Sequence, residues 1–268
     1  MFYCKKQFGQ NFLIDQFIIT SIVDHIKTNS NQILIEIGPG NGAITAPLLA
    51  RCQQLIAIEI DRELISELNK KFYNAIQNNT LTLINQDVLY FNFIELLNKY
   101  SKNNIKIIGN LPYNISTPLL FKLFALRTHQ NLESMHFLLQ KEVAERLIAQ
   151  PKCRQYGKLS IMAQYHAKMN IVFYVKSSAF NPKPKVESAM VEFIPYRKLP
   201  ITANNYEHFN QLVTTAFSQR RKILSNSLKN VCSKADWELL NLNPTARAEQ
   251  LSVHDFVKIS NFLVEKLN

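Results

Sequence analysis

Residues 33–42 read Ile-Leu-Ile-Glu-Ile-Gly-Pro-Gly-Asn-Gly, an apolar run that ends in a glycine-rich turn. A short apolar run bounded by glycine is typical of a strand buried inside a sheet. Glycines at the turn let the backbone bend sharply and approach a ligand without a Cβ clash. Apolar residues at helical spacing precede the run, between Phe17 and Ile26. The pattern therefore predicts a helix, a buried strand and a turn that can hold a ligand.

Four more apolar runs of strand length follow this unit, at 55–59, 81–84, 105–109 and 135–139. Helical segments fill the gaps between them, and this alternation predicts an α/β fold with a largely parallel sheet. Two β-branched runs, near 171–175 and 186–194, flank a proline-rich turn. They predict a hairpin-like pair of strands at the end of the sheet.

The pattern changes after Pro195, where apolar residues follow helical spacing, as in 209–217 and 256–263. Pro195 and Pro200 bracket a linker-like segment between the two patterns. We therefore predict two domains. Residues 1–197 form an α/β domain that carries the glycine turn, and residues 198–268 form a small all-helical domain.

The charge of the chain indicates a polyanionic partner such as a nucleic acid. The 268 residues carry a net charge of +11, within an ordinary globular composition of 47% apolar and 19% charged residues. Between Lys141 and Lys198 there are eleven Lys or Arg residues and four Asp or Glu residues. A solvated basic surface is the simpler explanation, and charge alone does not exclude it.

Other features of the composition favour a cytoplasmic protein. No run approaches the ~18 uninterrupted apolar residues of a membrane helix, and the first residues lack the apolar core of a signal peptide. The four cysteines, Cys4, Cys52, Cys153 and Cys232, form no CxxC pair. We therefore expect reduced thiols and no metal site.

Two acidic residues follow the next two strands. Glu59 ends the strand after the glycine turn, and 21 residues separate it from Gly38. A carboxylate at this position can accept both ribose hydroxyls of a nucleoside. Asp87, followed by Val88, offers an acceptor for an adenine amine. The simpler readings are a solvated strand end for Glu59 and a helix N-cap for Asp87.

The turn has the pattern GxGxG, in which Gly38, Gly40 and Gly42 alternate with other residues. Turns that bind dinucleotides carry GxGxxG, whose third glycine lets a helix N-terminus approach the pyrophosphate. S-adenosylmethionine has no phosphate, and its amino-acid tail requires backbone groups and polar neighbours at the turn. The pattern therefore favours S-adenosylmethionine as the cofactor.

Asn110-Leu111-Pro112-Tyr113 follows the fourth strand, at the edge where open α/β sheets bind ligands. An aromatic amine is a poor nucleophile because its lone pair is delocalised into the ring. The Asn110 side-chain oxygen and a backbone carbonyl fixed by Pro112 can accept its two N–H groups and favour a pyramidal nitrogen. Tyr113 can stack on the base, which is worth ~1–3 kcal/mol. The alternative is a plain proline-containing loop.

The segment Phe180-Asn181-Pro182-Lys183-Pro184-Lys185-Val186 is a second candidate for contact with the base. Its two prolines stiffen the loop and would hold Phe180 against the face of the base opposite Tyr113. Lys183 and Lys185 can meet phosphates. A proline-rich turn with a buried phenylalanine is the simpler alternative.

The chain resembles the ribosomal RNA adenine N6-dimethyltransferases, and within them the bacterial enzymes that act on small-subunit (16S) rRNA. The matching runs cover nearly the whole chain: 8–13, 36–40, 110–118, 140–143, 156–160, 180–186 and 219–222. The resemblance implies a Rossmann-like S-adenosylmethionine-dependent methyltransferase domain followed by a helical RNA-binding domain. It implies dimethylation of two adjacent adenosines in the 3′-terminal hairpin loop of 16S rRNA, within the small (30S) ribosomal subunit, and a role in subunit biogenesis.

The resemblance also implies roles for individual residues. The expected cofactor-binding residues are Asn11, Leu13, Gly38, Gly40, Glu59, Asp87, Val88 and Asn110. The expected catalytic residues are Asn110, Leu111, Pro112, Tyr113 and Phe180. For phosphate contacts we nominate the basic residues Lys141, Arg146, Lys183, Lys185, Arg220, Arg221 and Lys222, although each is equally compatible with a solvated charge.

Three other functions stay open from the sequence. A sister methyltransferase that acts on large-subunit rRNA and confers antibiotic resistance shares most motifs. A nicotinamide-dependent oxidoreductase is disfavoured by the missing third glycine and by the Asn110 tetrapeptide. An assembly factor with methylation as a secondary role would keep the same fold. We expect a monomer, because the RNA supplies the large interface.

Overall fold

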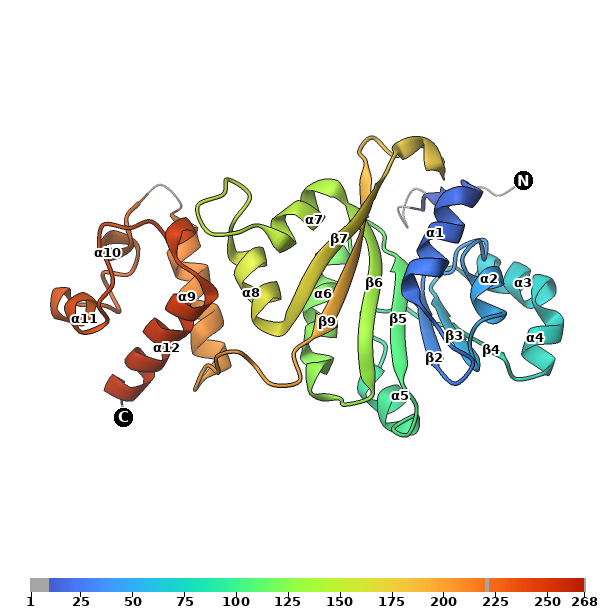
Figure 1. Cartoon of the computed structure of the whole chain (residues 1–268), viewed down its shortest axis with the longest axis horizontal. Coiled ribbons are helices and arrows are strands. Elements are labelled where there is room, and N and C mark those ends of the chain that lie inside the picture. Colours follow the sequence, from blue (N-terminus) through green and yellow to red (C-terminus); the bar gives the residue numbers. More distant parts are fainter. Residues whose placement is uncertain (1–9, 220–221, 268) are drawn as a thin grey trace. The chain divides into compact units, whose positions relative to one another are not determined.

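The computed structural model describes residues 10–219 and 222–267 of the chain (Figure 1). Seven strands form one sheet in the order β4-β3-β2-β5-β6-β9-β7. Their bounds are β2 Ile33–Ile37, β3 Gln54–Glu59, β4 Leu81–Asn85, β5 Ile105–Asn110, β6 Leu132–Gln140, β7 Ala167–Val175 and β9 Ser188–Pro195. The pairs among β4, β3, β2, β5 and β6 are parallel, and β9 runs antiparallel to β6. The predicted α/β class is confirmed.

Helices fill the connections as the apolar spacing predicts. Those before β6 are α1 Gln16–Ile26, α2 Thr45–Leu49, α3 Arg62–Lys71, α4 Tyr73–Gln77, α5 Phe93–Lys99, α6 Ser116–Phe124 and the 3-10 turn η2 Ala125–Thr128. Those after β6 are α7 Lys141–Ile148, α8 Lys158–His166, η3 Ser177–Ala179, α9 Tyr206–Ser218, α10 Leu224–Ser227, α11 Lys234–Leu239, η4 Ala248–Gln250 and α12 Val253–Leu267.

The helix α1 anchors one face of the sheet. The Asp15 side chain caps it by accepting hydrogen bonds from the backbone N–H groups of Phe17 and Ile18. Its apolar stripe packs against side chains of β2, β5 and β6 in one buried cluster: Ile19, Ile22, Val23, Ile26, Leu34, Ile108 and Leu138. Each fully buried side chain of this kind contributes about 1.5–3 kcal/mol, so this packing fixes the segment that enters α1.

A two-stranded sheet joins distant parts of the chain ahead of α1. Its strands are β1 Phe12–Leu13 and β8 Phe180–Asn181, and they pair antiparallel, with Leu13 opposite Phe180. The backbone N–H of Ile14 also donates to the Ala179 carbonyl at 2.9 Å. The N-terminal segment, residues 10–13, is therefore held by the loop that precedes β9.

The order of the strands places the binding edge. The chain runs from β2 outward to β3 and β4, then crosses to β5 on the other side of β2. Neighbouring connections therefore leave the sheet in opposite directions between β2 and β5. A crevice opens at such a switch point, outside the carboxyl ends of the strands.

Two compact units emerge from the contacts within the chain. One contains residues 1–144 and 168–197, and the other contains 145–167 and 198–268. In the second unit, α8 packs on α9 and α12, and the buried Tyr156 donates its hydroxyl to the Leu251 carbonyl at 2.9 Å. Residues 145–167 thus group with the C-terminal helices, whereas the sequence pattern assigns them to the first domain. No helix in the described part of the chain combines the length and apolarity needed to cross a membrane.

Candidate active site

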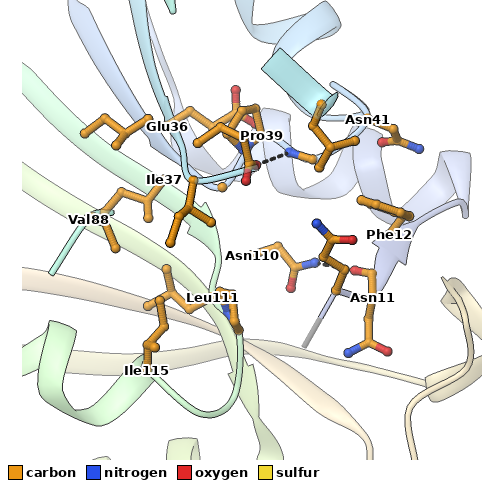
Figure 2. A pocket seen from close by; sticks show the side chains of 18 of the residues that line it. Asn11, Phe12, Glu36, Ile37, Pro39, Asn41, Val88, Asn110, Leu111 and Ile115 are labelled. Carbon is orange, nitrogen blue, oxygen red and sulfur yellow. Dashed lines mark hydrogen bonds between the residues drawn. The ribbon is translucent and has the colours of Figure 1, made fainter. Parts of the chain in front are cut away.

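A cavity of about 340 Å³ lies at the carboxyl edge of the sheet (Figure 2). Four strand ends line it, those of β2, β3, β4 and β5, and the N-terminal segment closes one side. In Figure 2, Asn11 and Phe12 lie across the cavity from Val88, with Asn110 beside Asn11. The structure therefore brings together residues that are about 100 positions apart in the chain.

The glycine turn adopts a backbone that other residues rarely allow. Gly38 and Gly40 have φ values of +67° and +57°, in the left-handed region. A Cβ on Gly40 would lie 3.0 Å from the Phe12 ring, so the glycine also makes room for the N-terminal segment. The turn follows β2 directly and lines the cavity, as the sequence predicts.

Glu59 ties the end of β3 to this turn. One of its carboxylate oxygens accepts from the Gly40 backbone N–H at 3.2 Å, and the other accepts from the Asp61 N–H at 3.0 Å. Burial raises the pKa of the Glu59 carboxyl, and these hydrogen bonds oppose the rise. A carboxylate has about four acceptor positions, and the Ile60 backbone N–H also contributes a hydrogen bond, so at least one position remains for a hydroxyl of a ligand.

Glu36, which the site prediction omits, also lines the cavity. It lies within β2, is 2% exposed, and accepts a hydrogen bond from the Thr45 hydroxyl at 2.7 Å. Burial raises the pKa of its carboxyl to about 7, with a further contribution from the nearby Glu59. An acidic residue inside an otherwise apolar strand, just before the glycine turn, is the sequence signal that identifies it.

Asp87 and Val88 line the cavity after β4. The Asp87 carboxylate accepts from the Leu89 backbone N–H at 2.8 Å in an Asx-type turn, whereas the N-cap of the next helix, α5, is Asn92. That bond occupies one oxygen only. Because Val88 is buried beside it, the pair offers an apolar surface and a carboxylate to one ligand ring.

The N-terminal segment is tied to the cavity by side-chain hydrogen bonds. Asn110 donates its side-chain N–H to the Asn11 carbonyl at 2.9 Å, and Gln10 donates to the Asp61 carboxylate at 3.0 Å. The predicted residues Asn11 and Leu13 both line the cavity. The residue types of this segment carry no local signal of such a position, because the segment has the pattern of an ordinary lead into a helix.

In the segment after β5, the carbonyl groups of Leu111 and Pro112 differ in their hydrogen bonding. The Pro112 carbonyl accepts from the N–H groups of Ile115 and Ser116, at 3.2 and 3.1 Å, and so begins α6. Leu111 donates its N–H to the Leu138 carbonyl at 3.2 Å, and its side chain is buried. The Leu111 carbonyl, beside Pro112, is therefore a candidate backbone acceptor for a ligand. The Asn110 side-chain oxygen is the second candidate, because an N–H of the amide already donates to the Asn11 carbonyl. Both roles stay predictions.

The two aromatic residues lie in different environments. Tyr113 lines the cavity, and its hydroxyl forms a hydrogen bond of 3.0 Å with the Ser188 hydroxyl. Burial raises the pKa of this phenol. Phe180 is 3% exposed, packs in the α1 core cluster, and is absent from the cavity wall. The structure therefore brings Tyr113 but not Phe180 to the cavity, and stacking by Phe180 stays a prediction.

The nominated basic residues are spread over the chain. Lys183 and Lys185 are exposed in the loop between β8 and β9. Lys141 pairs with Glu187 at 2.9 Å and lies over the Tyr174 ring. Arg146 and Lys222 are exposed residues of the helical unit. Arg220 and Arg221 lie outside the described residues, so their predicted role stays a prediction.

The lining of the cavity suits a cation that carries a nucleoside. Three carboxylates line it, those of Glu36, Glu59 and Asp87, and no Lys, Arg or His is present among the described lining residues. A phosphate would find no cationic partner, whereas a sulfonium and an ammonium group would find opposite charge. The volume lies within the usual range of small-molecule sites. The residues present therefore fit S-adenosylmethionine, which Glu59 would hold at the ribose, Asp87 and Val88 at the adenine, and the glycine turn at the tail.

Comparison with known proteins agrees with this geometry. The model of the family described as ribosomal RNA adenine dimethylase matches residues 1–265. Ribosomal RNA small subunit methyltransferase A of Coxiella burnetii is 44% identical over 259 residues, which cover 97% of each protein. The protein of the same name from Actinobacillus pleuropneumoniae is 43% identical over 264 residues, covering 97% of this chain and 90% of the relative.

Solved structures share the fold. A dimethyladenosine transferase from Plasmodium falciparum superposes with a TM-score of 0.77 at 27% identity, covering 95% of this chain and 98% of that one. The 23S rRNA methyltransferase ErmE superposes with a TM-score of 0.69 at 20% identity, covering 95% and 100%. At that identity the second likeness concerns the fold alone.

Proposed function

Because the chain belongs to the ribosomal RNA adenine dimethylase family, we propose that it dimethylates the N6 amines of two adjacent adenosines in small-subunit rRNA. The proposed target is the 3′-terminal hairpin loop of 16S rRNA within the 30S subunit, and the proposed role is in subunit biogenesis. Relatives at 43–44% identity carry the name ribosomal RNA small subunit methyltransferase A. The enzyme class, an S-adenosylmethionine-dependent methyltransferase, follows from the family.

The observation that carries the proposal is the state of Asn110. An N–H of its side-chain amide is committed to the Asn11 carbonyl, which leaves the side-chain oxygen as an acceptor one residue before the Leu111 carbonyl. Two acceptors on adjacent residues match the two N–H groups of one exocyclic amine. A hydroxyl or a ring nitrogen would leave one of them without a donor.

When bound, S-adenosylmethionine supplies a methyl group on a sulfonium, which is already activated toward a nucleophile. The chain supplies alignment. Asn110 and Leu111 hold the amine so that its lone pair leaves the ring plane, and Tyr113 supports the flat base. No strong base is required, because a methylated aromatic amine is acidic enough to release its proton to water.

The RNA must deliver an unstacked adenine, which costs less in a hairpin loop than in a duplex. We propose that Lys141, Lys183 and Lys185 contact phosphates near the cavity and that the C-terminal helical domain, with Arg146 and Lys222, supplies further contacts. A monomer acting in the cytoplasm fits this partner. The large-subunit alternative has support only from the shared fold of ErmE.

The deciding experiment is transfer of labelled methyl from S-adenosylmethionine to 30S subunits that lack the 3′-loop modification, followed by nuclease digestion. We expect dimethyladenosine at two adjacent loop positions. Incorporation into large-subunit RNA alone would move the enzyme to the resistance branch. Cofactor binding without incorporation into either RNA would reject the proposed substrate while leaving the cofactor site in place.

A further inference from the structure

A polar cluster lies on the sheet face that α1 covers, away from the cavity. It consists of His25 on α1, His136 on β6 and Glu192 on β9. His136 and Glu192 are directly opposite each other in the antiparallel pair of β6 and β9, so their side chains leave the same face. His25 reaches them from above, with its ring 6.1 Å from that of His136. None of the three lines the cavity.

Two nitrogens of this cluster are buried without a partner. Among the described residues, His25 Nε2 and His136 Nδ1 have no hydrogen bond, although each is removed from solvent. Leaving such atoms unpaired costs about 1–3 kcal/mol each, which calls for a ligand in the space between them. Glu192 places a carboxylate oxygen 4.0 Å from His25 Nε2, too far for a hydrogen bond.

The hydrogen bonding of His136 prepares one of its nitrogens as a ligand. Its Nε2 lies 2.8 Å from the Ser134 hydroxyl. With the ring proton on Nε2, the lone pair of Nδ1 remains available, and metal-binding histidines are usually oriented by such a second hydrogen bond.

We propose that His25, His136 and Glu192 bind one divalent transition-metal ion, with Zn²⁺ as the reference case. Two imidazoles and one carboxylate are a donor set that this class of ion accepts, with water completing the coordination. One ligand atom of each residue lies within 4.8 Å of the others. Ligands of tetrahedral zinc at ~2.1 Å lie roughly 3.4 Å apart, so small side-chain rotations would close the site.

The surroundings allow both entry and charge balance. The side chains of His25 and Glu192 are 30% and 25% exposed, which leaves a path for the ion from solvent. The buried Lys106 lies on β5, the strand next to β6, and its charge opposes the metal. Its ammonium group is held by Glu133 at 3.2 Å and by the Ile26 carbonyl at 2.8 Å, which offsets that opposition. The ion would join α1 to the two strands that it covers.

The test uses the full chain, dialysed against a chelator and then titrated with ZnCl₂. We expect one tightly bound equivalent by calorimetry and elemental analysis, and a rise in Tm of about 5 °C. The variants His25→Gln and Glu192→Gln should each weaken binding at least ~10-fold. The control variants are His254→Gln and Glu238→Gln, at two exposed positions, and they should leave the affinity for zinc unchanged.

A second readout separates this site from the cysteines. Co²⁺ bound by nitrogen and oxygen gives visible d–d bands without the intense near-ultraviolet band of thiolate ligation. We expect visible d–d bands without the thiolate band, and we expect these d–d bands to disappear in Glu192→Gln. A thiolate band, an unchanged affinity in both site variants, or no saturable binding would each overturn the proposal. An absence of saturable binding would mean that water, and not a metal ion, occupies the space between the three side chains. If Glu192→Gln fails to fold, the same zinc and cobalt titrations of His25→Gln, whose substitution lies on α1, test the proposal.

Discussion

The side chain of Asn110 donates a hydrogen bond to the backbone carbonyl of Asn11, with 2.9 Å between the two atoms. This bond links the end of β5 to the segment that closes the cavity. It leaves the side-chain oxygen of Asn110 as an acceptor. Under the proposed function, this one interaction orients the acceptor for the target amine and positions the N-terminal side of the cofactor site.

Asn110→Ala should remove both effects. We expect kcat for methyl transfer to fall by about 100-fold or more, as when one preorganised polar contact is removed from an active site. Binding of immature 30S subunits should persist, because it depends on other surfaces. Single-turnover transfer and a subunit-binding assay measure the two quantities. Unchanged transfer would contradict the assigned role, and loss of both would argue against separable binding and catalysis.

Gly40→Ala should weaken cofactor binding. The left-handed backbone costs about 1–2 kcal/mol with a side chain, and the added Cβ would press on Phe12. We expect the Kd for S-adenosylmethionine to rise roughly 10-fold, measured by calorimetry. Gly157→Ala is the control, because its backbone is extended and a Cβ there meets no atom within 4 Å. Equal effects of the two changes would refute this explanation.

Glu36 should make the stability of the ligand-free protein depend on pH. Its pKa rises from 4.5 to about 7 on folding, so the native state keeps a proton that the unfolded chain loses in this window. Native stability therefore falls as the pH rises through the window, by up to ~3 kcal/mol. Urea unfolding of wild type and Glu36→Gln at several pH values tests this. The advantage of the variant should grow toward pH 7 and above, and parallel curves would contradict the prediction.

Lys106 should be a stability residue without a catalytic role. It is 5% exposed and binds the carbonyls of Ile26 and Lys27 at the end of α1, together with Glu133. Lys106→Met should lower the free energy of unfolding by about 2–4 kcal/mol, since a buried network loses its cation. Denaturant unfolding measures the loss. The exposed Lys102→Met should change it by less than ~0.5 kcal/mol, and transfer per folded molecule should be unaltered.

The loop that carries Lys183 and Lys185 should contribute to the salt dependence of RNA binding. Each phosphate contact adds about 0.7–0.9 to the slope of log K against log salt concentration. The double change to glutamine should therefore reduce the slope by about 1.5, measured between ~50 and ~200 mM salt. The control replaces Lys99 and Lys102 and removes the same charge. If both double variants reduce the slope of log K against log salt concentration equally, RNA binding depends only on the net charge of the protein and not on contacts made by this loop.

The sheet was predictable because buried strands and their glycine turn have local signals. The periodicity of β2 and the position of Glu59 located the edge of the sheet that carries the cavity, without any knowledge of tertiary contacts. Asn11 and Leu13 had no such signal, because their place at the cavity depends on distant parts of the chain. Asn11 accepts a hydrogen bond from Asn110, 99 positions away, and Leu13 pairs with Phe180. The same holds for the grouping of 145–167 with the C-terminal helices, where local α-helical pattern says nothing about which core a helix joins.

Phe180 illustrates the limit of reasoning from composition. A phenylalanine beside two prolines is equally suited to a base platform and to a core, and β-pairing with Leu13 decides where it packs in this structure. The metal-ligand cluster was also invisible in the sequence. His25, His136 and Glu192 are far apart in the chain, and only the packing of α1 across β6 and β9 brings them together.

The carboxylate lining of the cavity bears on turnover. Dimethylation of two adenosines consumes four methyl groups, so the spent cofactor must leave and be replaced between transfers. A cofactor that has given up its methyl group would be a neutral thioether in place of a sulfonium, so its attraction to the carboxylates of Glu59 and Asp87 would be weaker. Even about 1 kcal/mol of lost attraction makes the product bind roughly fivefold more weakly. The acidic lining of the cavity therefore favours the charged cofactor over its neutral product, and each methyl transfer promotes the exchange of the product for a new cofactor.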